Sequence, residues 1–242
     1  MDSRPLILAP RLQMIADMVA GTRIADVGTD HGYLPIYLLQ QKRIDFAIAS
    51  DIGREPLAHA VRSAEEYGIV QGIDFRLCAG LDAIAPQEVD TVVIAGMGGE
   101  TIAQILDTAP WTREGTHTLL LQPMSKQPLL RRFLWERGYC ITRERLVLDK
   151  GTIYPIIEAR AGTMQEPTAA QCYGGILLTN DPLFGAYADE LIRKLRRAAA
   201  GRAQAKDTQT APEDFAAIAD ALENMKGEWE NADCKRDRAN SF

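Results

Sequence analysis

Residues 22–38 read TRIADVGTDHGYLPIYL. A short apolar run leads to a turn at Gly28, and leucine and isoleucine residues at helical spacing follow the turn. A buried strand that turns through glycine into a helix is typical of the ligand-binding edge of an open α/β sheet. The stretch therefore predicts the first strand, the ligand loop and the first covering helix of such a sheet.

The same alternation continues toward the C-terminus. Short aliphatic runs predict strands at residues 22–28, 45–51, 73–79, 89–96 and 117–122. Helical patterns lie at residues 33–41, 54–68, 100–109 and 126–138. This order predicts βαβ units and a mostly parallel, twisted sheet. Two further runs, at 140–148 and 152–160, flank a gap that contains Gly151, which favours an antiparallel final hairpin.

The ends of the chain add helices. Leu12, Ile15, Ala16 and Val19 have helical spacing and predict a helix that packs on the sheet or covers its ligand crevice. Residues 161–182, rich in glycine, threonine, proline and asparagine, predict a linker. Two amphipathic stripes follow, and they predict a helical hairpin or short coiled coil. The stripes are Phe184, Tyr187, Ala188, Leu191, Leu195 and Ala198, then Phe215, Ile218, Ala219, Leu222, Met225 and Trp229.

The boundaries of these parts follow from the change in composition. We expect an α/β domain at residues 1–160, and a linker with a helical region at residues 161–242. Thr210 and Glu213 have capping-box spacing at the start of the second stripe. The acidic and basic residues after Trp229 predict a frayed end.

Composition limits the class of protein. The chain has 242 residues, 46% of them hydrophobic and 25% charged, and a net charge of −6, which are ordinary globular values. The first residues, MDSRPLILAPRLQ, lack the apolar core of a signal peptide, and no apolar run is long enough to span a bilayer. The four cysteines form no CxxC pair, so we expect free thiols in the cytoplasm. His59 and His117 show no ligand spacing with His31, so we expect no metal.

Acidic residues surround the glycine turn. Asp26 precedes Gly28, and Asp30 stands where a dinucleotide-binding loop has its second glycine. Two carboxylates would repel a pyrophosphate, but they favour the ammonium and sulfonium groups of S-adenosylmethionine. The loop therefore favours this cofactor over NAD.

The next three predicted strands also end in suitable residues. Asp51 follows the second strand, where an acidic side chain can accept ribose hydroxyls. Residues 80–82 follow the third strand and can present an amide and a carboxylate to an adenine ring. Glycines in residues 96–99 let the backbone approach a ligand closely. Each feature alone also fits a turn or a helix cap, but four matching strand ends favour a cofactor site.

Five motifs are more specific. ADVGTDHGYLPIYL, IASDIGREPL, AGLDAI, DTVVIAGMGGETI and LLLQPM resemble the bacterial tRNA (adenine-22)-N1-methyltransferase family, from about Arg11 to Glu158. Members of that family often carry alanine where Gly32 stands. The resemblance implies a Rossmann-like class I methyltransferase fold with a C-terminal coiled coil. It also implies that S-adenosylmethionine donates a methyl group to N1 of the adenine at position 22, in the D-arm region of tRNA.

The resemblance further implies roles for individual residues. Asp26, Gly28 and His31 would surround the methionine moiety, Asp51 and Ile52 would hold the ribose, and Gly80, Leu81 and Asp82 would hold the adenine. Ala95, Gly96, Met97, Gly98 and Gly99 would form the floor between the cofactor and the target base.

The expected reaction needs little proton transfer. N1 of neutral adenine has a free lone pair, so positioning and electrostatics should provide most of the acceleration. Asp30 is the candidate catalytic residue, because its carboxylate can stabilise the positive charge that moves onto the base. It equally fits a cap of the following helix. His31 fits a cofactor contact or an ordinary hydrogen-bonded histidine. Tyr33 can face the entering base, but a place in the core is favoured.

The expected partner is tRNA, with no membrane and no metal; the oligomeric state is left open, with a monomer favoured. Pairing occludes N1, so the base must be exposed and the RNA recognised by shape and backbone. Basic candidates are Lys126, Arg131, Arg132, Arg137, Arg143 and Arg145, then Arg193, Lys194, Arg196, Arg197, Arg202 and Lys206. They also fit solvated helix faces. The alternatives are methyl transfer to another acceptor and a non-catalytic, cofactor-binding RNA scaffold.

Overall fold

The computed structural model describes residues 5–204 and 214–239. The chain divides into two compact units. The first contains Met1–Arg143 and Val147–Gln165, and the second contains Glu144–Leu146 and Glu166–Phe242. In the described part of the chain, no helix has the length and apolar character needed to cross a membrane.

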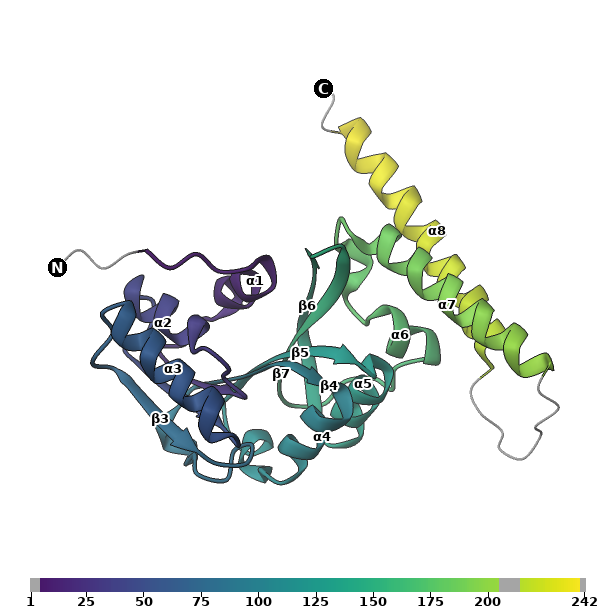
Figure 1. The fold of residues 1–242 in the computed structure, drawn as a ribbon. Coiled ribbons are helices and arrows are strands. Elements are labelled where there is room, and N and C mark those ends of the chain that lie inside the picture. The colour runs from purple at the N-terminus through teal and green to yellow at the C-terminus, as the bar shows by residue number, and fades with distance from the viewer. Residues whose placement is uncertain (1–4, 205–213, 240–242) are drawn as a thin grey trace. The chain divides into compact units, whose positions relative to one another are not determined.

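The first unit is built on a seven-stranded sheet in the order β3-β2-β1-β4-β5-β7-β6 (Figure 1). The strands are β1 (Arg23–Val27), β2 (Phe46–Asp51), β3 (Ile73–Leu77), β4 (Thr91–Gly98), β5 (Thr118–Ser125), β6 (Tyr139–Asp149) and β7 (Thr152–Ala161). The first five strands pair in parallel, and β7 pairs antiparallel with β5. Lys150 and Gly151, both with positive φ, join β6 to β7 as a tight hairpin turn. The predicted strands and the antiparallel end of the sheet are confirmed.

The helices of this unit lie at the predicted places. They are α1 (Pro10–Met18), α2 (Tyr33–Gln40), α3 (Arg54–Glu66), α4 (Gly99–Asp107) and α5 (Gln127–Glu136), with short 3-10 turns η1 (Pro86–Glu88) and η2 (Pro110–Arg113). Pro10 begins α1, where its missing N–H costs no hydrogen bond. Ile15 and Ala16 on α1 are completely buried in the same apolar cluster as Leu34 and Ile36 of α2. The N-terminal helix therefore packs on the domain, as its spacing predicted.

The core of the sheet lies in β1, β2, β4 and β5. Ile24, Ile48, Val93 and Leu120 have no exposed surface, because both faces of a parallel sheet are covered. Buried polar residues lie at both ends of these strands: Thr91 and Thr118 begin β4 and β5, whereas Asp26, Ser50 and Gln122, which include the only carboxyl group of the five, lie toward the carboxyl ends. Buried polar groups are costly unless they are paired, so this edge of the sheet is where function is to be sought.

The second unit contains α6 (Ala169–Gly174), the 3-10 turn η3 (Leu178–Asn180), α7 (Phe184–Gln204) and α8 (Phe215–Ala239). The ion pairs Asp189–Lys226 (2.8 Å) and Arg196–Glu223 (2.9 Å) show that α7 and α8 run antiparallel. The predicted helical hairpin is confirmed; a supercoil stays a prediction. The stretch 161–182, predicted as a linker, contains α6, because Thr168 and Gln171 form a reciprocal capping box that starts this helix.

The start and end of α8 also differ from the prediction. Asp214 caps the helix by accepting hydrogen bonds from the amides of Ala216 and Ala217, both at 3.1 Å. The predicted capping residues Thr210 and Glu213 lie outside the described residues. The helix does not end near Trp229 but continues to Ala239. Its last turns contain no glycine or proline, and the glutamate, lysine and arginine residues there have good helix propensity.

Candidate functional site

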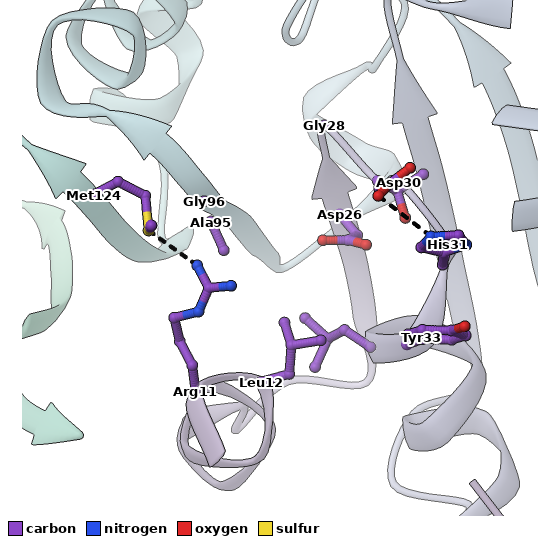
Figure 2. A pocket seen from close by; sticks show the side chains of 12 residues that line it. Arg11, Leu12, Asp26, Gly28, Asp30, His31, Tyr33, Ala95, Gly96 and Met124 are labelled. Carbon is purple, nitrogen blue, oxygen red and sulfur yellow. Dashed lines mark hydrogen bonds and ion pairs between the residues drawn. The ribbon is translucent and has the colours of Figure 1, made fainter. Parts of the chain in front are cut away.

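A cavity of about 360 Å³ opens at the carboxyl edge of β1 and β4 (Figure 2). This volume falls in the range of small-molecule sites, about 300–1,000 Å³. The lining residues come from α1, β1, the β1–α2 loop, α2, β4 and β5: Arg11, Leu12, Asp26, Gly28, Thr29, Asp30, His31, Tyr33, Leu34, Ala95, Gly96 and Met124. The cavity therefore brings together six of the residues proposed from sequence: Asp26, Gly28, Asp30, His31, Ala95 and Gly96.

The β1–α2 loop is held by backbone hydrogen bonds. The amides of Gly28 and Thr29 both donate to the carbonyl of Ser50, at 2.8 and 2.9 Å. Gly28 has φ +78, and a Cβ added to it would lie 2.0 Å from the methyl group of Met97. Glycine suits this position, because it adopts positive φ without strain and leaves room for the methyl group of Met97. The turn thus keeps the backbone close to the cavity.

Asp26 is a buried carboxyl group at the cavity wall, with 8% of its surface exposed. Burial raises the pKa of Asp26 to about 6, and the Asp51 carboxylate adds to this rise. Among the described residues, no lysine or arginine forms an ion pair with Asp26. A cationic ligand would favour the charged form of this carboxylate.

Asp30, His31 and Tyr33 form the outer part of the cavity (Figure 2). Asp30 makes no hydrogen bond to α2, whose N-cap is Gly32, so the alternative that Asp30 caps this helix is wrong. Its Oδ2 lies 3.4 Å from Nε2 of His31 instead. His31 stacks on Tyr33, with ring centroids 5.1 Å apart. Tyr33 is 37% exposed, so its expected place in the core was also wrong.

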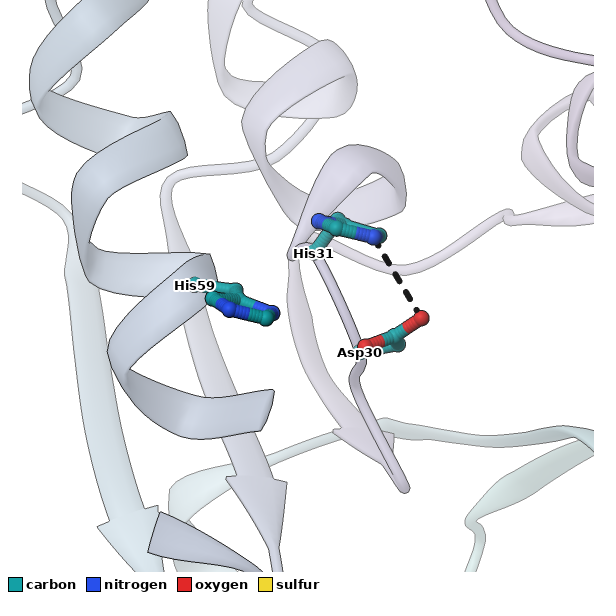
Figure 3. A group of neighbouring side chains, drawn as sticks. All are labelled: Asp30, His31 and His59. Carbon is teal, nitrogen blue, oxygen red and sulfur yellow. Dashed lines mark ion pairs between the residues drawn. The ribbon is translucent and has the colours of Figure 1, made fainter. Parts of the chain in front are cut away.

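His59 of α3 lies beside this loop (Figure 3). Its ring is stacked on that of His31, with centroids 5.4 Å apart and planes at 6°. One ligand atom each from Asp30, His31 and His59 lie within 4.8 Å of one another. The expectation that His59 offers no ligand spacing with His31 was wrong, because the βα crossover brings α3 alongside the loop although the residues are distant in sequence.

Arg11 and Gln122 are site residues that the sequence predictions missed. Gln122, completely buried, accepts hydrogen bonds through Oε1 from Arg11 Nη1 (2.9 Å) and from the amide of Gly96 (3.0 Å). Arg11 also donates to the sulfur of Met124 at 3.1 Å, and its Nε lies 3.6 Å from Asp149. The signal was present: one arginine interrupts the apolar face of α1, and one glutamine ends the run LLL in β5.

The remaining residues from the second and third strands lie outside the lining of the cavity. Asp51 ends β2 and accepts a hydrogen bond from the Gly53 amide at 2.6 Å, and Ile52 is 78% exposed. Gly80 has φ +51 after β3, the Leu81 side chain is buried, and Asp82 is exposed. These residues lie at the carboxyl ends of neighbouring parallel strands, and their cofactor roles stay predictions.

The glycine-rich end of β4 has two parts. Ala95 and Gly96 line the cavity, whereas Met97 packs against Gly28. Gly98 caps α4 and Gly99 begins it. A Cβ on Gly99 would lie 2.5 Å from the carbonyl oxygen of Lys126. Gly99 is therefore explained by close packing of two backbones, and its proposed contact with a cofactor is not needed to account for it.

The basic residues proposed for RNA contact differ in their surroundings. Arg131 is completely buried, because it lies on the inward face of α5, and its assignment to an RNA surface was wrong. Arg137, Arg143, Lys194 and Arg196 are engaged with acidic neighbours, and Lys126 lies 4.0 Å from Glu100. Arg145, Arg193 and Arg197 are exposed and form no ion pair among the described residues; Arg132 is half-buried. The side chain of Arg202 and all of Lys206 lie outside the described part.

The sheet order, the acidic loop and the cavity are together typical of a Rossmann-like methyltransferase domain. A model of the methyltransferase domain matches residues 8–157, and the chain belongs to this family. The chain is also 34% identical over 183 residues to the tRNA (adenine(22)-N(1))-methyltransferase of Bacillus subtilis, a match that covers 75% of each protein. Within the methyltransferases, it therefore belongs to the tRNA (adenine(22)-N(1))-methyltransferase family, and the resemblance drawn from its motifs is confirmed.

Solved structures agree with this assignment. Streptococcus pneumoniae Sp1610, solved in complex with S-adenosyl-L-methionine, is similar with a TM-score of 0.78 and 30% identity, over 89% of this chain and 98% of that chain. M. capricolum TrmK, solved with S-adenosyl-homocysteine, is similar with a TM-score of 0.72 and 25% identity, over 92% and 98% of the two chains. The likeness extends beyond the sheet to most of this chain.

Proposed function

We propose that this protein transfers the methyl group of S-adenosyl-L-methionine to N1 of adenine 22 in tRNA. The observation that carries the proposal is the buried carboxyl group of Asp26, which lines a ligand-sized cavity and has no basic partner among the described residues. A buried carboxylate in this state is complementary to a cationic ligand. Membership of the tRNA (adenine(22)-N(1))-methyltransferase family supports the acceptor.

The residues present fit the methyl donor. Its methionine end is a zwitterion, with one ammonium and one carboxylate group. Asp26 from β1 and Arg11 from α1 both line the cavity (Figure 2), so a carboxylate and a guanidinium are available for the two charges. Gly28 and Gly96 leave the backbone bare on the walls between them. We assign the ammonium group to Asp26 and the carboxylate group to Arg11.

Asp30 is the proposed catalytic residue. When bound, the cofactor supplies the electrophilic methyl group, and the attacking N1 needs no deprotonation. Positive charge then develops on the adenine, and the Asp30 carboxylate at the cavity can stabilise it or accept a proton from the exocyclic amine afterwards. Since Asp30 does not cap α2, its charge is available for this role. His31 orients Asp30 through their 3.4 Å contact.

RNA binding is the second part of the proposal. The target N1 lies on the base-pairing edge, so the base must leave its pair before it enters the cavity. Exposed Tyr33 offers an aromatic face for stacking at the cavity. Arg145, Arg193 and Arg197 are the basic residues with the least internal competition. We propose that the enzyme acts in the cytoplasm as a monomer.

The direct test is mass spectrometry of unmodified tRNA after incubation with the purified protein and S-adenosyl-L-methionine. We expect one added methyl group, and nuclease mapping should place it as N1-methyladenosine at position 22. A methyl group found on another base or on protein would show that adenine 22 is not the acceptor. Binding of S-adenosylhomocysteine without transfer to any acceptor would favour the non-catalytic scaffold.

A further inference from the structure

The three side chains Asp30, His31 and His59, here called the histidine cluster, contact one another at the surface of the first unit (Figure 3). They come from two separate elements, the β1–α2 loop and α3. Two imidazoles and one carboxylate form the ligand set of many three-ligand zinc sites, in which water takes the fourth position. Imidazole ligands favour first-row transition metal ions over Mg²⁺.

We propose that the histidine cluster binds one divalent transition metal ion of the Zn²⁺ class. Two of the three ligand atoms already have suitable spacing, since His31 Nε2 and Asp30 Oδ2 lie 3.4 Å apart. Ligands about 2.0–2.1 Å from a tetrahedral ion are separated by about 3.4 Å. A ligand atom of His59 lies within 4.8 Å of both, so it must approach by roughly the length of one bond.

Rotation of an imidazole ring closes this distance. The His31 and His59 rings are parallel within 6°, and a metal ion lies in the plane of each imidazole that binds it, so one ring must turn. The terminal torsion of histidine is broad, and His59 is only half-buried, so the turn is sterically possible. The backbone of the loop is held by Ser50 and that of His59 by α3, which keeps both ligand groups within reach.

The electrostatic surroundings favour a cation. Asp30 has 72% of its side chain exposed, and its one ion pair among the described residues is with His31. Asp26 and Asp51 add acidic groups at the same strand ends. An ion can therefore reach the cluster from solvent without displacing a lysine or arginine from Asp30.

Co²⁺ absorption spectroscopy on the full chain tests the site, because the spectrum distinguishes nitrogen and oxygen ligands from thiolates. We expect one Co²⁺ per chain, without a thiolate band and displaced by Zn²⁺. His59→Gln removes one ligand, and should weaken binding by about 100-fold, at or beyond the 10–100-fold effect of losing a supporting residue. Glu65→Gln, an exposed change on the same helix, should bind as the parent does. Equal binding by His59→Gln, or no saturable binding by the parent, would overturn the proposal.

Histidine NMR gives a second readout that does not need a variant. The chain contains three histidines, and Zn²⁺ should shift the ring signals of His31 and His59 but leave buried His117 unchanged. Calorimetry with S-adenosylhomocysteine in EDTA, on the parent and on His59→Gln, checks the cofactor site separately. If the parent protein does not bind S-adenosylhomocysteine, the result counts against the proposed function. The metal proposal is decided separately, by Co²⁺ binding alone.

Metal binding has one consequence that rests on the proposed function. Asp30 and His31 cannot serve methyl transfer while they ligate an ion, so Zn²⁺ should inhibit the parent enzyme reversibly. His59→Gln should need about 100-fold more Zn²⁺ for the same inhibition. Equal inhibition of both proteins would place the inhibiting ion elsewhere and contradict this consequence.

Discussion

The region around the β1–α2 loop and the α7–α8 hairpin are both rich in charged side chains, but they differ in whether these side chains have partners of opposite charge. Asp26, at the end of β1 before the loop, is buried without a basic partner among the described residues, and Asp30 in the loop lines the cavity. In the hairpin, Arg196 contacts both Asp220 and Glu223, and Lys226 contacts Asp189 and Glu230. The hairpin pairs several of its charges with one another, whereas the acidic groups at the β1 end have no lysine or arginine partner among the described residues.

This difference indicates where binding energy is available. Exposed ion pairs within the hairpin contribute little stability each, up to about 1 kcal/mol, but they reduce the charge that the hairpin offers to RNA. An uncompensated buried carboxylate costs stability in the free protein, and a cationic ligand recovers that cost. Substitutions that change each kind of charge in turn test whether the β1 end and the hairpin differ in this way.

The largest effect is expected from Asp30→Ala. Removal of a carboxylate that stabilises developing charge should lower kcat by about 100-fold or more, while the affinity for S-adenosylhomocysteine stays near that of the parent. Single-turnover kinetics and calorimetry measure the two quantities. Asp45→Ala, at an exposed position before β2, is the matched control. Near-normal turnover in Asp30→Ala would make this side chain structural.

Asp26 should make cofactor binding depend on pH. Its pKa is about 6, and a cationic ligand prefers the ionised form, so affinity should be full above pH 6 and fall about tenfold per unit below it. Asp26→Asn should bind weakly at every pH. Calorimetry with S-adenosylhomocysteine between pH 5 and 8 provides the curve, and a flat parent curve would show that Asp26 does not face the ammonium group.

The same carboxyl group should oppose folding in the free protein. Its pKa rises from 3.8 to about 6 on folding, so the folded state holds the proton more tightly and loses stability as pH rises through this window. The loss should be about 3 kcal/mol or less at pH 7 and above. Asp26→Asn should therefore raise the melting temperature at pH 8 but change it little at pH 4. A lower melting temperature at pH 8 would contradict this account.

Arg11→Met should weaken binding of S-adenosylhomocysteine by about tenfold or more, which is the worth of one hydrogen bond to a charged group, about 1.5–3 kcal/mol. The methionine side chain keeps much of the contact with Met124 and the Tyr154 ring. Homocysteine analogues without the carboxylate supply the control, because the parent and the variant should bind them equally. If the variant loses affinity equally for S-adenosylhomocysteine and for the analogue without the carboxylate, Arg11 acts only through Gln122.

The smallest effect is expected on the hairpin. Charge reversal at Arg193 and Arg197 should weaken tRNA binding and lower the salt dependence of log K by about 0.9 for each phosphate that the protein no longer neutralises, without a change in melting temperature. Arg196→Glu should instead destabilise the hairpin, since it places three acidic side chains together. Unchanged tRNA affinity in the double variant would remove the hairpin from the RNA-binding surface.

Much of the fold could be predicted because its signals are local. The alternation of aliphatic runs and helical stripes located the seven strands, and the glycine turn at Gly28 located the ligand loop. The incorrect predictions of secondary structure also come from reliance on local signals. The capping box at Thr168 and Gln171 is as clear as any other, but it lies in a stretch whose glycines and prolines suggested a linker.

The site was harder to predict, because its residues meet only through the tertiary fold. Arg11 lies on α1 and Gln122 on β5, and no local pattern connects them. His31 and His59 meet because α3 returns beside the first loop. Arg131 was predicted on the surface because its sequence context resembles that of the neighbouring basic residues, but its side chain is completely buried. Local chemistry identified the acidic loop, whereas the partners that complete the cavity are brought to it only by folding.

The short α1 has a practical consequence for anyone who trims this protein. A nine-residue helix is too short to be stable in isolation, and it holds its shape only by burying Ile15 and Ala16 in the core. Its first turn nevertheless supplies Arg11 and Leu12 to the cavity. A fragment that begins at residue 20 would retain every strand of the sheet, yet it would lack Arg11 and Leu12 and with them one wall of the cavity.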